Sequence, residues 1–92
     1  MSTSFRDNAA LDRYELVEDG QVAWADYRKA PGRLIIDHVE SPMALRGKGT
    51  AGRLMTAVAE EARKDGVKIT PICGYAATWL RRSHAYADLI AG

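Results

Sequence analysis

A short glycine-rich segment, Arg46-Gly47-Lys48-Gly49-Thr50-Ala51, has the residue types needed to bind an anion. Glycines let the backbone turn tightly, so several N–H groups are free and close to an incoming ligand. The residues after the segment predict a helix, whose N-terminus carries partial positive charge. Arg46 and Lys48 add two full positive charges at the same place. The segment therefore predicts a phosphate-binding site.

The neighbouring elements must hold this segment in place. Residues 33–40 contain the β-branched run Leu34-Ile35-Ile36-Asp37-His38-Val39-Glu40 and predict a strand. Behind the segment, helical spacing of apolar residues predicts a helix from about Gly49 to Asp65, with Gly66 at the C′ position. The apolar face of that helix is formed by Ala51, Leu54, Met55, Val58, Ala59 and Ala62.

The rest of the chain predicts a small sheet with helices. Asp19-Gly20 is a strong hairpin signal between two strands. A fourth strand after the helix would complete a right-handed β-α-β unit with parallel strands. The expected strands cover 13–17, 21–27, 33–40 and 67–73, with a turn at 29–32. Short helical segments are expected at 76–82 and 84–90.

Pro71 interrupts the fourth expected strand. Because proline has no N–H group, the pairing of that strand must lapse on one side. Two interpretations follow. The strand lies at the edge of the sheet, or Pro71 marks the point where two neighbouring strands part and a ligand inserts between them.

Length and composition limit the class of protein. The chain has 92 residues, enough for one modest core. We expect a flexible N-terminus over residues 1–10 and a single domain over residues 11–92. No apolar run approaches the roughly 20 residues that span a bilayer, and the N-terminus lacks the apolar core of a signal peptide. The lone Cys73 cannot form an internal disulfide, which favours a cytoplasmic location.

Charge is divided unevenly along the chain. Residues 1–40 hold five basic and eight acidic side chains, for −3, whereas residues 41–92 hold eight and four, for +4. The basic half contains the glycine segment, which suits an anionic ligand. The charge is too small and too spread to indicate nucleic-acid binding. No metal site is expected, because the histidines, the acidic residues and the one cysteine lack metal-ligand spacing.

Four short motifs occur in an order that resembles a known family. They are His38-Val39-Glu40, Leu45 to Gly49, Pro71 to Tyr75, and His84-Ala85-Tyr86. Residues 46–51 match the Arg/Gln-x-x-Gly-x-Gly/Ala signature of the GNAT acetyltransferase superfamily. The whole set resembles its minimal single-domain members over roughly residues 11–90. The resemblance implies an α/β (α+β) fold, with an antiparallel meander, a β-α-β unit and C-terminal helices.

The resemblance also implies a cofactor, acetyl-coenzyme A (acetyl-CoA). Backbone N–H groups of residues 46–51 would hold its pyrophosphate, and the main chain of residues 38–40 would pair with its pantetheine arm. The full expected set is His38, Val39, Glu40, Arg46, Gly47, Lys48, Gly49, Thr50, Ala51, Tyr75, Arg81, Arg82 and Tyr86. The other partner would be an amine acceptor. No nucleic acid or membrane partner is expected. The protein would work as a monomer or a weak homodimer.

Acetyl transfer to an amine needs a base, a polarised carbonyl and an acid for the leaving thiolate. Glu40 is the candidate base, acting directly or through a water molecule; its alternative is a solvated carboxylate. Cys73 is an acid, an acetyl carrier or a packed apolar residue. His38 is a candidate proton carrier, or it is a hydrogen-bonded histidine that shapes the pocket. Tyr75 protonates the thiolate or anchors the strand-to-helix junction.

These features favour an N-acetyltransferase with an unknown acceptor. Ordinary GNAT enzymes carry additional elements that build the acceptor pocket, and this chain has no room for most of them. Two alternatives therefore stay open. One is a module that binds or senses coenzyme A with little turnover, and the other is an interaction domain that completes its pocket with a partner or as a dimer.

Overall fold

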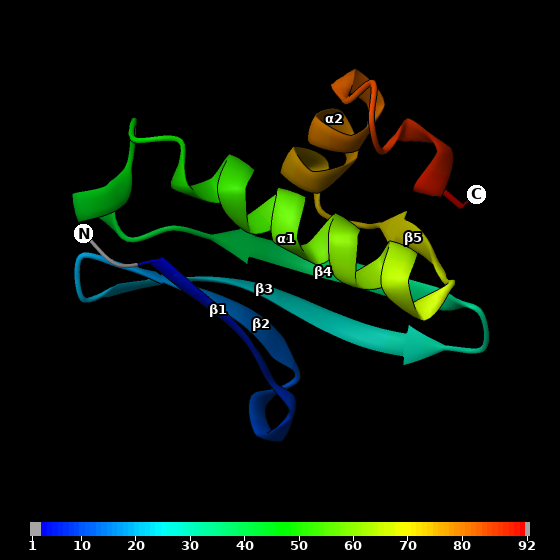
Figure 1. Cartoon of the computed structure of the whole chain (residues 1–92), viewed down its shortest axis with the longest axis horizontal. Helices are drawn as coiled ribbons and strands as arrows, with labels where there is room; N and C mark the ends of the chain where they lie inside the picture. Colours follow the sequence, from blue (N-terminus) through cyan, green and yellow to red (C-terminus); the bar gives the residue numbers. More distant parts are fainter. Residues whose placement is uncertain (1–2, 92) are drawn as a thin grey trace.

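A five-stranded mixed sheet forms the base of the molecule. The computed structural model describes residues 3–91 of the chain. The strands follow the order β1-β2-β3-β4-β5, with antiparallel pairing up to β4 and parallel pairing between β4 and β5 (Figure 1). Their bounds are β1 Thr3–Asn8, β2 Arg13–Glu18, β3 Gln21–Ala30, β4 Arg33–Glu40 and β5 Lys68–Pro71. The predicted α+β fold class is confirmed.

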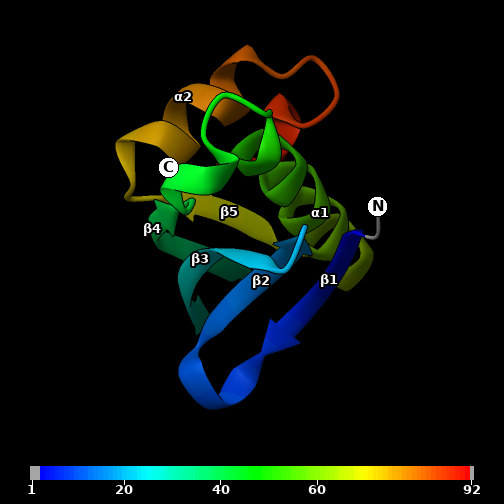
Figure 2. The ribbon, with the colours of Figure 1, turned by 90° about the vertical axis from the view of Figure 1, so that its left-hand side faces the viewer.

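Both helices cover the same face of the sheet, α1 (Thr50–Asp65) and α2 (Gly74–Arg82) (Figure 2). Short 3-10 turns occur at Ala9–Leu11, Met43–Leu45 and Ala87–Leu89. The predicted hairpin is present, because Asp19 and Gly20 both adopt positive φ between β2 and β3. None of the helices in residues 3–91 is long and apolar enough to cross a bilayer.

The core lies between α1 and the sheet. Five of the six apolar positions predicted for the helix are fully buried, whereas Ala51 is only half-buried at its first turn. Burying a side chain of the size of Leu54 contributes about 1.5–3 kcal/mol, so this face fixes the helix on the sheet. Facing it on the strands are Tyr14, Leu16, Ala23, Ala25, Tyr27, Leu34 and Ile36.

Helix α1 ends at the predicted residue, Asp65. Gly66 has φ +71° and donates its N–H to the last carbonyls of the helix, those of Ala62 and Arg63. Only glycine adopts this left-handed conformation without strain. The chain therefore turns sharply at Gly66 into β5.

The N-terminal segment corrects our expectation of a flexible end. Thr3–Asn8 forms strand β1, which pairs with β2 along its whole length. Phe5 stacks on Tyr14 with ring centroids 5.5 Å apart, and Arg6 and Asn8 donate to Glu15. The segment lacks the apolar alternation that normally predicts a strand, and these contacts with β2 stabilise it instead. The rest of the expected flexible segment forms a 3-10 turn, apart from Met1 and Ser2, which lie outside the described residues.

The C-terminal segment contains one helical turn, within the short helical segment expected over 84–90. This turn, Ala87–Leu89, is a 3-10 turn and is shorter than the expected range. Beyond it the chain is extended, since Ile90 bridges Ile69 and the N–H of Ala91 donates to the Ile69 carbonyl at 2.7 Å. Bonding to the sheet edge requires extended backbone and so stops a helix from forming here.

Candidate functional site

The glycine loop, residues 46–51, connects the end of β4 to the start of α1. Gly47 and Gly49 both have φ +79°, a conformation that other residues adopt only with strain. Gly49 occupies the N-cap of α1, and no side chain caps this helix. The two glycines therefore permit a turn that brings the loop backbone to the end of the helix.

Several N–H groups in this region have no acceptor. The loop satisfies the amides of Arg46, Lys48 and Arg53 with the carbonyls of Met43, Leu45 and Gly49. Within residues 3–91, no hydrogen bond is formed by the amides of five others, Gly47, Gly49, Thr50, Ala51 and Gly52. Free amides and the helix dipole together favour an anion at this position.

These five residues line one hollow, which we call the loop hollow. It has a volume of about 240 Å³ and is also lined by Ser41, Leu45, Arg46 and Tyr75. The buried Ser41 hydroxyl has no hydrogen-bond partner among the described residues. Lys48 does not line the loop hollow; it lines a separate hollow with Glu18 and Arg53. The charge of Arg46, rather than that of Lys48, therefore lies at the anion site.

A buried carboxylate supports the loop from the sheet. Glu18, at the end of β2, is 6% exposed and accepts hydrogen bonds from Thr50 and Arg53 of α1. Sequence reasoning missed this residue. A signal was present, because Tyr14 and Leu16 alternate onto the core face of β2 and the next position on that face is Glu18.

Strands β4 and β5 part beside the loop. Their pairing ends at Ile36 and Pro71, where the Ile36 carbonyl accepts from the amides of Ile72 and Cys73 at 2.9 and 3.1 Å. Strand β4 continues to Glu40, so within the described chain residues 37–40 have no strand beside them on the β5 side. Pro71 therefore lies at the edge of the sheet and also at the point where the strands part.

The four candidate catalytic residues lie around this gap. The His38 Nε2 is 3.1 Å from the Glu40 Oε2, and both side chains are partly exposed. Cys73 is half-buried against the core and precedes α2. Burial raises the pKa of the Tyr75 hydroxyl, and the nearby Cys73 thiol raises it further. The structure thus joins His38 to Glu40 directly and places Cys73 near Tyr75.

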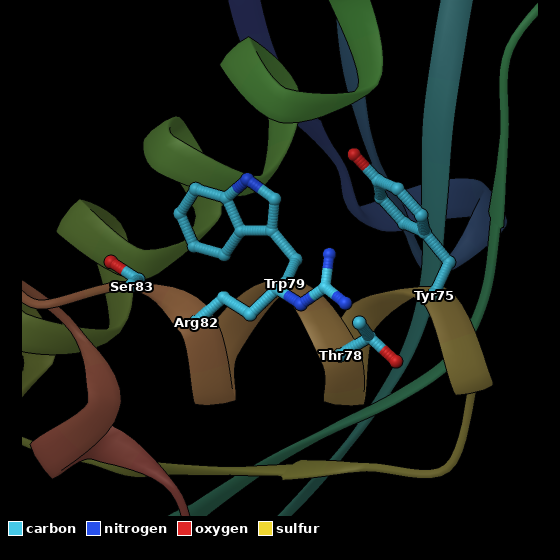
Figure 3. Close-up of a pocket in the computed structure, with 5 residues that line it drawn as sticks. All are labelled: Tyr75, Thr78, Trp79, Arg82 and Ser83. Carbon is cyan, nitrogen blue, oxygen red and sulfur yellow. The ribbon is translucent and has the colours of Figure 1, made fainter.

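A second hollow adjoins the loop hollow, and we call it the α2 hollow. It has a volume of about 320 Å³ and is lined by Tyr75, Thr78, Trp79, Arg82 and Ser83. Figure 3 shows the rings of Tyr75 and Trp79 projecting from α2 on the same side. Tyr75 lines both hollows, and the Trp79 Nε1 lies 3.5 Å from the position that a Cβ at Gly52 would occupy. Sequence reasoning did not identify Trp79 as part of the site.

Three other predicted contacts have different environments. Arg82 lines the α2 hollow, whereas Arg81 is exposed and does not line it. The Tyr86 hydroxyl donates to Glu60, and its ring stacks on Trp79 with centroids 5.9 Å apart. Tyr86 therefore supports the Trp79 ring from outside the α2 hollow.

The comparisons with known proteins agree with this geometry. A family model described as GCN5-related N-acetyl-transferase matches residues 13–89, which include β4, the glycine loop and β5. The chain belongs to the GCN5-related N-acetyltransferase family. Among curated proteins, none matches this chain.

A protein of known structure has a similar fold. It is a GCN5-like protein from Staphylococcus aureus, solved by NMR, with a TM-score of 0.70 to this chain. The two sequences are 24% identical, and the match covers 97% of this chain and 88% of the other. The resemblance seen in the sequence is therefore confirmed at the level of family and fold.

Proposed function

We propose that the protein binds acetyl-CoA and transfers its acetyl group to an amine. The observation that carries this proposal is the set of five unpaired amides at the N-terminus of α1, all lining the loop hollow. A pyrophosphate has enough acceptor oxygens to satisfy such a set. The unpaired Ser41 hydroxyl and the Arg46 guanidinium add two further donors beside it.

The gap between β4 and β5 suits the pantetheine arm. Residues 37–40 of β4 have a free edge, and pantetheine contains amide groups that can pair with a strand edge. Main-chain atoms of His38, Val39 and Glu40 would make these bonds. The α2 hollow adjoins the loop hollow and offers the rings of Tyr75 and Trp79 and the Arg82 guanidinium to the rest of the cofactor.

The reaction exchanges a C–S bond for a C–N bond. Acetyl-CoA supplies the acetyl group as a thioester, and the acceptor nitrogen replaces the thiol. Glu40 takes a proton from the acceptor nitrogen, directly or through a water molecule, while His38 orients the Glu40 carboxylate. A backbone amide on the free edge of residues 37–40 polarises the carbonyl. Tyr75 or Cys73 returns a proton to the departing thiolate.

Calorimetric titration with acetyl-CoA, followed by thiol release with a panel of amines, tests the proposal. Binding with amine-dependent release of one thiol per acetyl group supports the full reaction. Binding without release from any amine supports a module that holds coenzyme A without turnover. No binding overturns the proposal, because the unpaired amides would then serve another ligand.

A further inference from the structure

Helix α1 begins without a side-chain cap. A typical helix has Ser, Thr, Asp or Asn at its N-cap, whose side chain accepts a hydrogen bond from one of the first free amides. Here the N-cap is Gly49, which has no side chain to do so. The amides stay available to a ligand, but no side chain of the N-cap residue holds the first turn.

Glu18 holds the first turn without using the amides. Its Oε1 accepts from the Thr50 hydroxyl at 2.7 Å, and its two oxygens accept from the Arg53 Nε and Nη2 at 2.6 and 2.8 Å. Both donors are side chains of the first turn of α1. The carboxylate therefore fixes this turn to β2 across 32 residues of sequence and leaves the backbone donors free.

Arg53 transmits the restraint to the loop. Its amide donates to the Gly49 carbonyl at 3.1 Å, and its Nη1 lies 3.1 Å from the position that a Cβ at Gly49 would occupy. Its guanidinium also neutralises the Glu18 carboxylate, so the nearby negative charge does not oppose a phosphate. Thr50 is 1% exposed, which leaves its hydroxyl little freedom to find another partner.

We infer that Glu18 is a positioning residue, which holds the first turn of α1 so that the free amides of residues 47 and 49–52 converge on a phosphate group. The inference rests on the proposed function, because it assigns the phosphate to the same loop. Glu18 itself lies behind the loop and does not line the loop hollow. It is therefore expected to act through Thr50 and Arg53, and not by contact with the ligand.

A matched control exists on the same strand. Glu15 is also buried, at 1% exposed, and accepts hydrogen bonds from Arg6, Asn8 and Arg13. These partners lie on β1 and β2, and none belongs to α1 or to the glycine loop. Glu15→Gln should therefore reduce stability as Glu18→Gln does, while the loop keeps its geometry.

The test uses inorganic pyrophosphate and follows the backbone amide signals of residues 47–52 by NMR. We expect pyrophosphate to shift these signals in the wild type and in Glu15→Gln with equal affinity, and to bind Glu18→Gln about tenfold more weakly. With Glu18→Gln, kcat/KM for acetyl-CoA should fall by a similar factor. The value for acetylpantetheine, which lacks the pyrophosphate, should not change, and a general loss of structure would lower both.

Each outcome decides the inference. Wild-type affinity for pyrophosphate in Glu18→Gln overturns it, even if acetyl transfer is established. Pyrophosphate binding that depends on Glu18, in a protein that transfers no acetyl group, supports it and counts against the transferase. If pyrophosphate does not shift the amide signals of residues 47–52 in the wild type, both this inference and the proposed function are overturned.

If Glu18→Gln does not fold, Thr50→Val removes the buried hydroxyl instead. This variant is expected to weaken pyrophosphate binding, and an unchanged affinity overturns the inference.

Discussion

His38 and Glu40 lie on the same face of β4, and the His38 Nε2 is 3.1 Å from the Glu40 Oε2. The pair stands in the stretch of β4 that continues past the last residue of β5. The imidazole can thereby hold the carboxylate toward the gap where the strands part. Glu40 also lies 4.0 Å from the Arg46 Nη2, which connects the candidate base to the glycine loop.

Replacing Glu40 by Gln should separate catalysis from binding. General-base catalysis contributes about 10²–10⁴-fold, so we expect kcat for amine acetylation to fall by at least about a hundredfold. Binding should change little, because the pantetheine arm pairs with backbone. Thiol release and calorimetry measure the two effects. Asp37→Asn is the matched control. The Asp37 carboxylate accepts hydrogen bonds from Arg28 on β3, so this substitution should leave kcat unchanged. Equal activity of Glu40→Gln and wild type would remove Glu40 from the mechanism.

Gly49→Glu should abolish cofactor binding. A carboxylate would enter the anion site, and a side chain at φ +79° would also strain the loop. Gly32→Glu controls for strain alone, because Gly32 has φ +72° in an exposed turn with open space around it. Calorimetry with acetyl-CoA should show no binding to the first variant and wild-type affinity for the second. Unchanged affinity in Gly49→Glu would contradict the pyrophosphate assignment.

The free energy of unfolding should fall at acid pH, because Glu18 becomes protonated. The hydrogen bonds from Arg53, and then from Thr50, lower the pKa of the Glu18 carboxyl from 4.5 to about 2. The unfolded chain therefore takes up this proton first, so the stabilisation is complete above about pH 5 and is lost as the pH falls toward 2. Urea unfolding across this range should show a falling free energy of unfolding. Glu18→Gln should have a shallower slope, and an identical slope would mean that Glu18 is not ion-paired in the folded state.

Alkylation of Cys73 should report where the thioester lies. Cys73 is half-buried beside the parting strands, so bound acetyl-CoA should cover its thiol and slow the reaction with iodoacetamide. Inorganic pyrophosphate is the control, because it should occupy the loop and leave the thiol accessible. Mass spectrometry gives both rates. Equal rates with and without acetyl-CoA would show that the thioester end of the cofactor does not reach Cys73.

Local signals in the sequence predicted the elements that carry the site. The β-branched run predicted β4 with the bounds observed, and Asp19-Gly20 predicted the hairpin between β2 and β3. The glycine loop and the apolar face after it predicted the start of α1 to within one residue. These features depend on backbone conformation and periodicity within a few residues, and such preferences can be read from adjacent side chains.

Strand β1 could not be predicted in the same way. Its residues are mostly polar, and two of them, Arg6 and Asn8, are satisfied by the buried Glu15 of β2. A polar segment of this kind has no apolar alternation, so its composition alone indicates a flexible end. The strand exists because a partner elsewhere in the chain accepts its hydrogen bonds.

The sequence by itself predicted the family, the glycine loop and the elements from β2 to α2, because each depends on neighbouring residues. Only the tertiary structure decided which groups meet. It placed Glu18 against Thr50 and Arg53, ended the pairing of β4 with β5 at Ile36, and brought Tyr75 to both hollows. Contacts between residues far apart in sequence depend on how the elements pack, and the periodic pattern within one element shows which face is buried but not which residues it meets.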